Sequence, residues 1–295
     1  MQRLFVLGCL AMAGCAHVRN ASSALEIERA VSQRIAELDS GLVAVSFIDL
    51  ANNQEFHISG DVSMHAASTM KVPVLLELYR QADAHEIALD SLIVVNNVFQ
   101  SIADTSHYKL DASDDSDSLV YTWIGQRKSI RELARHMIVR SSNLATNILI
   151  DLVKPARVRA TVASIGATGV NVQRGVEDIP AFRKGMNNTT TSRGLALVLA
   201  DIARCGHASR RACEEMIAVL SAQEFNEMIP AGLPKGTRVA HKTGWITGIQ
   251  HDGAIVFPPN RKPYVLVVLT KGIMDTTKAA QTGAAISRIV WDRVH

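Results

Sequence analysis

The stretch Ala66–Leu78, with the sequence AASTMKVPVLLEL, decides how the rest of the chain has to fold. It predicts a turn that leads into an amphipathic helix with one apolar face, made by Val72, Leu75, Leu76 and Tyr79. Ser68 and Lys71 are three residues apart, which places both side chains on one face of the first turn. A serine hydroxyl needs a neighbouring base, and a buried lysine with a lowered pKa suits that role. We therefore predict a site built around Ser68.

Length and composition favour an ordinary globular protein. The chain has 295 residues, of which 47% are hydrophobic and 20% are charged, enough for one or two domains with a substantial core. The net charge of +3 is too small to favour a nucleic-acid partner. No His-x-His or His-Glu-x-x-His pattern suggests a metal site, so we predict no metal and no cofactor, and we expect a monomer.

The N-terminus predicts export. Arg3 precedes the apolar run Leu4–Met12, which is too short to span a membrane as a mature helix and is typical of a signal peptide, here residues 1–23. Ala13 and Gly14 before Cys15 resemble a bacterial lipoprotein cleavage site, which would place a lipid anchor on Cys15. The alternative is an ordinary signal peptide cut after Ala13. Either version predicts a periplasmic protein.

Two cysteines remain outside the signal. Cys205 and Cys213 flank a predicted turn at Gly206–Ser209. In an oxidising compartment this arrangement favours a structural disulfide. The alternative is a pair of reduced, small apolar side chains packed under the helices.

The predicted strands lie at both ends of the chain and the predicted helices lie between them. Alternating or apolar runs predict strands at Leu42–Leu50, Glu55–Ile58, Thr237–Trp245, Ile249–Phe257 and Tyr264–Lys271. This order implies an α/β (α+β) fold with one antiparallel five-stranded sheet, built from both chain ends and flanked by helices. We assign residues 24–72 and 210–295 to the sheet domain and residues 73–209 to an inserted all-helical domain. Two long loops, 99–118 and 166–188, are predicted beside the site.

Three short motifs stand in order along the chain: Ser68-Thr69-Met70-Lys71, Ser141-Ser142-Asn143 and Lys242-Thr243-Gly244. A serine–lysine pair alone is weak, since it occurs by chance about once in a chain of this length. The pair Ser106 and Lys109 repeats it in a polar loop. The ordered triplet is far more specific. From Leu25 to Arg293 the sequence resembles the class A serine β-lactamases and the penicillin-recognising serine hydrolases.

Acylation by a cyclic amide requires a nucleophile, a base, a proton donor to the leaving nitrogen and a clamp for the substrate anion. Ser68 suits the first role, Lys71 the second and Ser141 the third. Lys242 and Thr243 suit the clamp, because they offer a charge and a hydroxyl to a carboxylate. The alternatives are helix capping for Ser141 and a solvated strand lysine for Lys242.

Three further residues complete the predicted site. Gly244 has no side chain, so a substrate can lie against its strand. The resemblance implies an oxyanion hole made by the backbone N–H groups of Ser68 and Trp245. It also implies that Asn143 contacts the substrate amide, with helix capping as the alternative.

The sequence departs from the class A pattern at two motif positions. Ser142 stands where class A members usually have aspartate. In the loop Arg174–Pro180, Glu177 comes one residue later than the family's glutamate, and no leucine–asparagine pair follows it. That glutamate activates the water for deacylation in the family. We predict this role for Glu177, with a solvated loop carboxylate as the alternative.

A third departure concerns His251, on the strand predicted to pair with the third motif. Class A members often have a carboxylate-binding arginine near this position. We expect His251 to lie across from Lys242 and Thr243 and to bind the substrate anion when protonated.

These residues imply a serine hydrolase that opens β-lactam rings through an acyl-enzyme on Ser68. The main alternative is a penicillin-binding D-alanyl-D-alanine peptidase-like enzyme, or another serine hydrolase, with slow deacylation. Its partner would be a small β-lactam or a peptidoglycan-like substrate. A third hypothesis is a lipid-anchored envelope protein that uses the cleft for binding alone.

Overall fold

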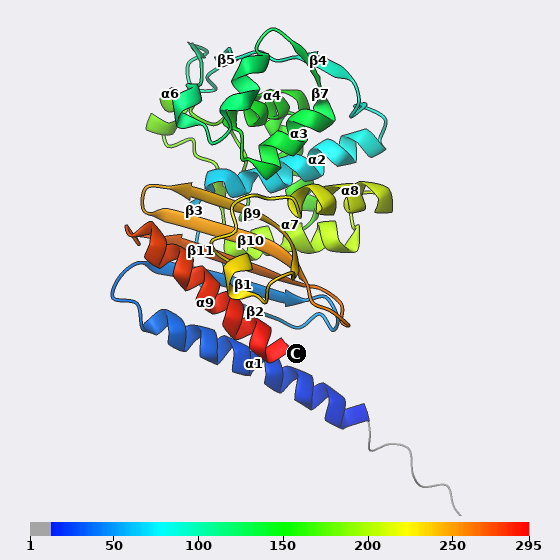
Figure 1. Cartoon of the computed structure of the whole chain (residues 1–295), viewed down its shortest axis with the longest axis vertical. Coiled ribbons are helices and arrows are strands. Elements are labelled where there is room, and N and C mark those ends of the chain that lie inside the picture. Colours follow the sequence, from blue (N-terminus) through cyan, green and yellow to red (C-terminus); the bar gives the residue numbers. More distant parts are fainter. Residues whose placement is uncertain (1–12, 295) are drawn as a thin grey trace, which may run out of the picture.

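The structure is a computed structural model that describes the backbone of residues 13–294 and the side chains of residues 24–294 (Figure 1). The predicted signal segment lies mostly outside these residues, and so does the side chain of Cys15. Export and lipid attachment therefore stay predictions. In the described part of the chain, no helix combines the length and the apolar character needed to cross a membrane.

A five-stranded antiparallel sheet forms the centre of the fold, as predicted. Its strand order is β2-β1-β11-β10-β9. The strands are β1 Leu42–Asp49, β2 Glu55–Ile58, β9 Arg238–Ile246, β10 Ile249–Phe257 and β11 Tyr264–Lys271. The two chain ends meet in the middle of the sheet, where β1 pairs with β11. Strand β9, which bears the third motif, pairs with β10 alone and forms one edge.

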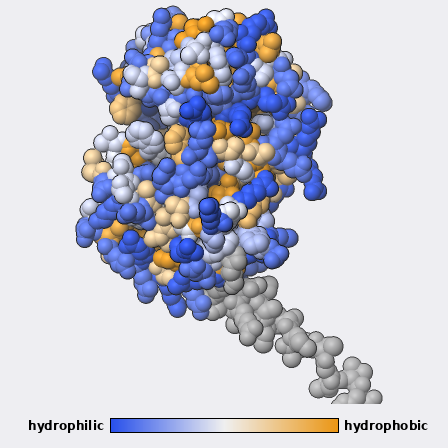
Figure 2. Space-filling model, viewed as in Figure 1, coloured by the Kyte–Doolittle hydropathy of each residue, from blue (hydrophilic) through white to orange (hydrophobic). Residues whose placement is uncertain are grey.

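Helices cover both faces of the sheet, so successive strand residues enter two different cores. Val43, Val45 and Phe47 pack on the side of α1 (Ala13–Ala36) and α9 (Thr276–Val294). Ala44 and Ile48 pack on the opposite side with the remaining helices. Because both faces are covered, β1 and β11 are apolar along most of their length. The face shown in Figure 2 is mostly hydrophilic, with hydrophobic residues in small groups.

The segment between β3 and β9 forms the helices on the second face of the sheet, and it also contains several short strands. Its helices are α2 Lys71–Asp83, α3 Ile130–Val139, α4 Asn143–Val153, α5 Pro155–Ser164, α6 Ile179–Arg183, α7 Ser192–Arg204 and α8 Arg210–Leu220. Short 3-10 turns are η1 Ala67–Met70, η2 Ala112–Asp114, η3 Ser118–Trp123 and η4 Pro230–Gly232. Two-residue and three-residue strands pair as β3 Met64–His65 with β8 Thr189–Thr190, β4 Leu92–Val94 with β7 Arg127–Ser129, and β5 Phe99–Gln100 with β6 His107–Tyr108.

Helix α2 is buried from Lys71 to Tyr79 and reaches solvent only in its last turn, where Asp83 is exposed. The predicted apolar face is buried, but the opposite face is buried as well, so this part of the helix is not amphipathic. Glu77 on its other face is completely buried and accepts hydrogen bonds from Arg80, Gln81 and Thr161. The helix runs between the sheet layer and the surrounding helices (Figure 1). Glu77 therefore does not mark a solvent-exposed face of the helix, because its carboxylate has hydrogen-bond partners in the interior.

Helix α7 packs on the sheet, so the predicted inserted segment 73–209 is neither all-helical nor wholly separate from the sheet. A Cβ atom on Gly253 of β10 would lie 2.9 Å from Leu195 and 3.1 Å from Leu199 of α7. The missing side chain in β10 lets this helix approach closely. The sequence order concealed this contact, because α7 follows the other helices of the inserted segment.

The favoured disulfide is absent from the described structure. Cys205 and Cys213 are both free thiols, and Cys213 is buried in the main apolar core. The prediction of a Cys205–Cys213 bridge was wrong, and the alternative of small apolar side chains is confirmed.

Candidate active site

The nucleophile lies in the turn that leads into α2. Ser68 is the second residue of η1, and the backbone N–H of Lys71 donates to its carbonyl oxygen. The residue before it, Ala67, has a φ of 45°, a left-handed conformation that costs free energy in a non-glycine residue. The turn is held by Thr69, whose Oγ1 donates to the Ala66 carbonyl at 2.6 Å. These hydrogen bonds fix the backbone of Ser68 at the start of the helix, as predicted.

Lys71 is completely buried, and its Nζ donates to the second motif. The contacts are 2.6 Å to the Ser141 carbonyl, 3.2 Å to Ser141 Oγ and 2.9 Å to Asn143 Oδ1. Burial lowers the pKa of Lys71 to about 7, against the opposing charges of Asp115 and Glu177, which raise it. A large neutral fraction therefore exists near neutral pH, as a general base requires.

Lys242 reaches the same hydroxyl from the sheet. Its buried Nζ donates to Ser141 Oγ at 3.0 Å and to the Thr243 carbonyl at 2.8 Å. Burial, followed by the nearby charge of Lys71, lowers the pKa of Lys242 well below its ordinary value. Ser141 Oγ thus lies between two amines that can pass it a proton, and the alternative of a solvated strand lysine is wrong for Lys242.

Asn143 connects this group to the long loop. Its Nδ2 donates to Glu177 Oε1 at 3.2 Å, while its Oδ1 accepts from Lys71. One hydrogen-bonded chain thus runs from Glu177 through Asn143, Lys71 and Ser141 to Lys242. Burial raises the pKa of Glu177, as expected for a half-buried carboxyl.

Glu177 is held in place by its chain neighbours. The side chain of Asn147 makes two hydrogen bonds to the backbone of Val176. Its Oδ1 accepts from the Val176 N–H at 2.6 Å, and its Nδ2 donates to the Val176 carbonyl at 2.9 Å. Asp178 is buried and accepts from Ser101 Oγ at 2.6 Å. Between these anchors Glu177 has a φ of 62°, a strained conformation that turns its side chain to the site. The carboxylate therefore reaches Asn143 although it comes one residue late in the loop.

Gly244 lets strand β9 lie directly against the nucleophile turn. A Cβ atom there would lie 2.7 Å from the Ser68 amide nitrogen and 2.9 Å from that of Thr69. Both neighbours are backbone atoms and cannot rotate away. The next residue, Trp245, has an indole that is 66% exposed at the mouth of the site.

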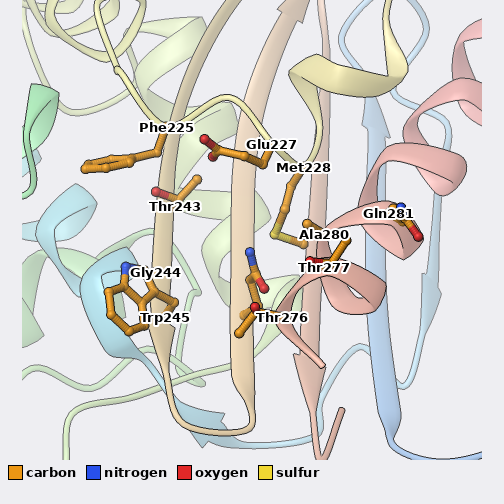
Figure 3. Close-up of a pocket in the computed structure, with 11 residues that line it drawn as sticks. Phe225, Glu227, Met228, Thr243, Gly244, Trp245, Thr276, Thr277, Ala280 and Gln281 are labelled. Carbon is orange, nitrogen blue, oxygen red and sulfur yellow. The ribbon is translucent and has the colours of Figure 1, made fainter. Parts of the chain in front are cut away.

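A cavity of about 540 Å³ adjoins this strand. Thr243, Gly244 and Trp245 line it from β9 (Figure 3). The rest of its wall comes from Gln250 on β10, the segment before η4 and the start of α9, with Phe225, Glu227, Met228, Thr276, Thr277, Ala280 and Gln281. Ser68, Lys71 and Ser141 are not among its lining residues, so the cavity lies beside the reacting groups and shares only the strand of the third motif with them. In the described chain, no group of His, Cys, Asp and Glu side chains is arranged to hold a metal ion.

We expect the change of Gly244 to alanine to lower kcat/KM for a β-lactam by about 10- to 100-fold, because β9 must move away from Ser68. The measurement is the acylation rate, with thermal unfolding as a check on the fold. Lys235→Ala, an exposed residue in the loop before β9, is the control. Equal acylation rates for Gly244→Ala and wild type would contradict the close approach.

The structure contradicts the expectation that His251 lies across from Lys242 and Thr243. It pairs with Gly244 rather than lying across from Lys242 and Thr243, and its side chain is completely buried. Its Nε2 bonds to the His65 carbonyl at 3.0 Å, and its Nδ1 accepts from the Thr270 amide at 3.2 Å. Burial lowers its pKa to about 4. His251 is therefore a neutral core residue, and the predicted role in binding the substrate anion is wrong.

This buried histidine predicts a pH-dependent stability. On folding its pKa falls from 6.5 to about 4, so the folded state binds fewer protons than the unfolded state between these values. Stability is then lost as the pH falls through this window, by up to about 3 kcal/mol. We expect His251→Gln to lose less stability than wild type between pH 7 and pH 4 in urea unfolding. Exposed His85→Gln serves as the control, and identical pH slopes in all three proteins would disprove the assignment.

Sequence reasoning missed two residues that shape the site. Asp115 accepts from the backbone N–H groups of Asn143 and Leu144, at 2.8 and 3.0 Å. Nothing in the sequence indicated this role, because Asp115 lies among several other acidic residues in a predicted loop. Asn147, which grips the long loop, lies four residues after Asn143 on the same face of α4. This i, i+4 spacing was a signal that could have identified it.

Comparisons with known proteins agree with this geometry. Residues 26–294 match the model of a family described as the beta-lactamase enzyme family. A beta-lactamase of Bacillus licheniformis is 24% identical over 90% of this chain and 85% of its own length. The structure of a beta-lactamase from Sphaerobacter thermophilus is 28% identical, with a TM-score of 0.77 over 90% of this chain and 95% of that one. The structure of PBP-A, 23% identical, has the same fold, with a TM-score of 0.79 over 91% of this chain and 96% of that one. Since the family model spans nearly the whole described chain, and since the three motifs meet around Ser68 and Ser141, this protein belongs to the beta-lactamase enzyme family.

Proposed function

We propose that Ser68 opens the ring of a β-lactam and forms an acyl-enzyme that water then hydrolyses. The observation that supports this most directly is the meeting of Lys71 and Lys242 on Ser141 Oγ, at 3.2 and 3.0 Å. This arrangement places a base next to the nucleophile turn and a proton donor beside the substrate clamp.

Acylation divides the proton transfers and the charge stabilisation among these groups. The neutral amine of Lys71 takes the proton of Ser68 Oγ as the oxygen bonds to the lactam carbonyl carbon. The negative charge that develops on the carbonyl oxygen is stabilised by the backbone N–H groups of Ser68 and Trp245. The C–N bond then breaks as Ser141 gives its proton to the nitrogen, and Lys71 returns a proton to Ser141. Lys242 and Thr243 bind the substrate carboxylate during these steps.

Deacylation is assigned to Glu177. Its carboxylate takes a proton from water as the oxygen attacks the ester carbon. As the bond from this carbon to Ser68 Oγ breaks, a proton passes from Lys71 to Ser68 Oγ, and the proton on Glu177 returns to Lys71 through the connecting hydrogen bonds. The contact with Asn143 and the raised pKa of Glu177 support this role.

A second candidate keeps the acylation but deacylates slowly, as a D-alanyl-D-alanine peptidase-like enzyme would toward penicillin. The observation in its favour is the loop itself, in which Ile179 and Pro180 follow without the family's leucine–asparagine pair. The acceptance of a peptidoglycan-like substrate belongs to this candidate.

Intact-mass spectrometry after mixing with benzylpenicillin, combined with nitrocefin hydrolysis, tests both candidates. Continued turnover with a transient adduct on Ser68 supports the β-lactamase. One equivalent of hydrolysis followed by a stable adduct supports the slow enzyme. The absence of any adduct overturns both and favours a protein that only binds. Ser68→Ala must lose the adduct in either case.

For its cellular place, we propose export to the periplasm with a lipid on Cys15. The apolar run after Arg3 and the small residues before Cys15 support this. The mass of the mature N-terminal peptide distinguishes a lipidated Cys15 from ordinary cleavage after Ala13. Gel filtration tests the expected monomer.

A further inference from the structure

We propose that Asp115 is a positioning residue of this active site, which supplies from a distant loop the carboxylate that the second motif lacks at Ser142. The inference rests on the proposed acylation of Ser68.

One carboxylate oxygen of Asp115 receives several donors. Oδ2 accepts from the amide of Asn143 at 2.8 Å, from the amide of Leu144 at 3.0 Å and from the hydroxyl of Tyr121 at 3.1 Å. A longer contact of 3.4 Å comes from Ser142 Oγ. Asn143 and Leu144 are the first residues of α4, whose amides have no acceptor within the helix. Asp115 therefore satisfies the start of this helix from outside it.

Ser142 performs only part of the capping. Its Oγ accepts from the Ala145 amide at 3.2 Å, and its side chain is completely buried. A single hydroxyl cannot accept from all the free amides of the first turn. The charge of Asp115 also favours this position, since the helix N-terminus has a partial positive charge. The cap of α4 is thus divided between a serine in the motif and an aspartate in the loop.

The divided cap fixes the position of Asn143, which is a member of the hydrogen-bonded chain from Glu177 to Lys242. The backbone of Asn143 is fixed by Asp115, while its side chain joins Lys71 at 2.9 Å and Glu177 at 3.2 Å. Ser141 lies just before this cap, in a left-handed conformation with a φ of 59°. A shift at the start of α4 would therefore move the partners of Lys71.

Asp115 also affects the charge balance at Lys71. Three charged groups face this amine: Asp115 from the loop, Glu177 from the long loop before α6, and Lys242 from β9. The negative charge of Asp115 raises the pKa of Lys71 against the larger effect of burial. Loss of that charge would leave Lys71 with a lower pKa.

The test compares Asp115→Ala and Asp115→Asn with wild type. We expect kcat/KM for nitrocefin to fall by about 10- to 100-fold in Asp115→Ala. The acid limb of its pH profile should move to a lower pH than the wild-type limb near pH 7, because Lys71 loses a stabilising charge. Asp115→Asn should show the same shift with a smaller loss of rate. The control Asp104→Asn, an exposed acid in the same loop, should stay within about twofold of wild type.

Rescue separates positioning from general destabilisation. Ser142→Asp in the Asp115→Ala background returns a carboxylate to the same helix start, and we expect it to restore most of the rate and move the acid limb back. A simple loss of folding would lower the melting temperature without this rescue or the pH shift, and would overturn the proposal. Unchanged kinetics in Asp115→Ala would also overturn it. Failure of wild type to form an adduct with benzylpenicillin would instead refute the proposed function.

Discussion

Replacing Lys71 with arginine is expected to lower kcat/KM for β-lactam acylation by about 10³- to 10⁴-fold. Arginine keeps its proton at all accessible pH values and cannot accept one from Ser68. Lysine can do so here because burial lowers its pKa to about 7. The measurement is the rate of adduct formation with benzylpenicillin by stopped-flow mass spectrometry.

The wild-type pH profile belongs to the same prediction. Since Lys71 must be neutral to act as a base, the acylation rate should rise with pH through about 7 and then level off. Lys71→Met, which keeps an unbranched side chain without an amine, should also be inactive, so that loss does not depend on the bulk of arginine. Lys235→Arg on the exposed loop before β9 is the matched control. A Lys71→Arg variant with more than a tenth of wild-type activity would rule out Lys71 as the base.

Replacing Glu177 with glutamine is expected to leave acylation nearly unchanged and to slow deacylation by about 10²- to 10³-fold. Glutamine keeps the size and can still accept a hydrogen bond from Asn143, but it cannot take a proton from water. The acyl adduct on Ser68 should then persist, and nitrocefin hydrolysis should stop after a burst of one equivalent.

The raised pKa of Glu177 gives this step a pH dependence as well. The carboxylate must be ionised to act as a base, so wild-type deacylation should slow as the pH falls, while Glu177→Gln should lose this dependence. Glu26→Gln, an exposed acid on α1 at the opposite face of the sheet, is the control. If the burst occurs already in wild type, and Glu177→Gln deacylates at the same rate, the slow-deacylating enzyme is the correct assignment.

The sequence alone predicted the sheet and the three motifs, because both depend on local patterns. The strands from Ile249 to Phe257 and from Tyr264 to Lys271 have the predicted bounds. The run from Tyr264 to Lys271 is rich in β-branched residues, and turn residues at Gly248 and Pro258–Asn260 bound the strand before it. The order of Ser68, Ser141 and Lys242 was likewise visible in the chain, since each motif is a few residues long. Predictions of this kind need no knowledge of distant contacts.

Only the tertiary structure decided which face each residue meets. His251 has the sequence position of a cleft residue, but the register of β10 points it at the His65 carbonyl, where burial keeps it neutral. Asp115 has the sequence context of a solvated loop, but the fold brings it to the start of α4. Hydrogen-bond partners that are far apart in sequence leave no local pattern. The sequence therefore determined which groups are present for the chemistry, and the packing of distant segments determined which of them are charged, buried and in contact.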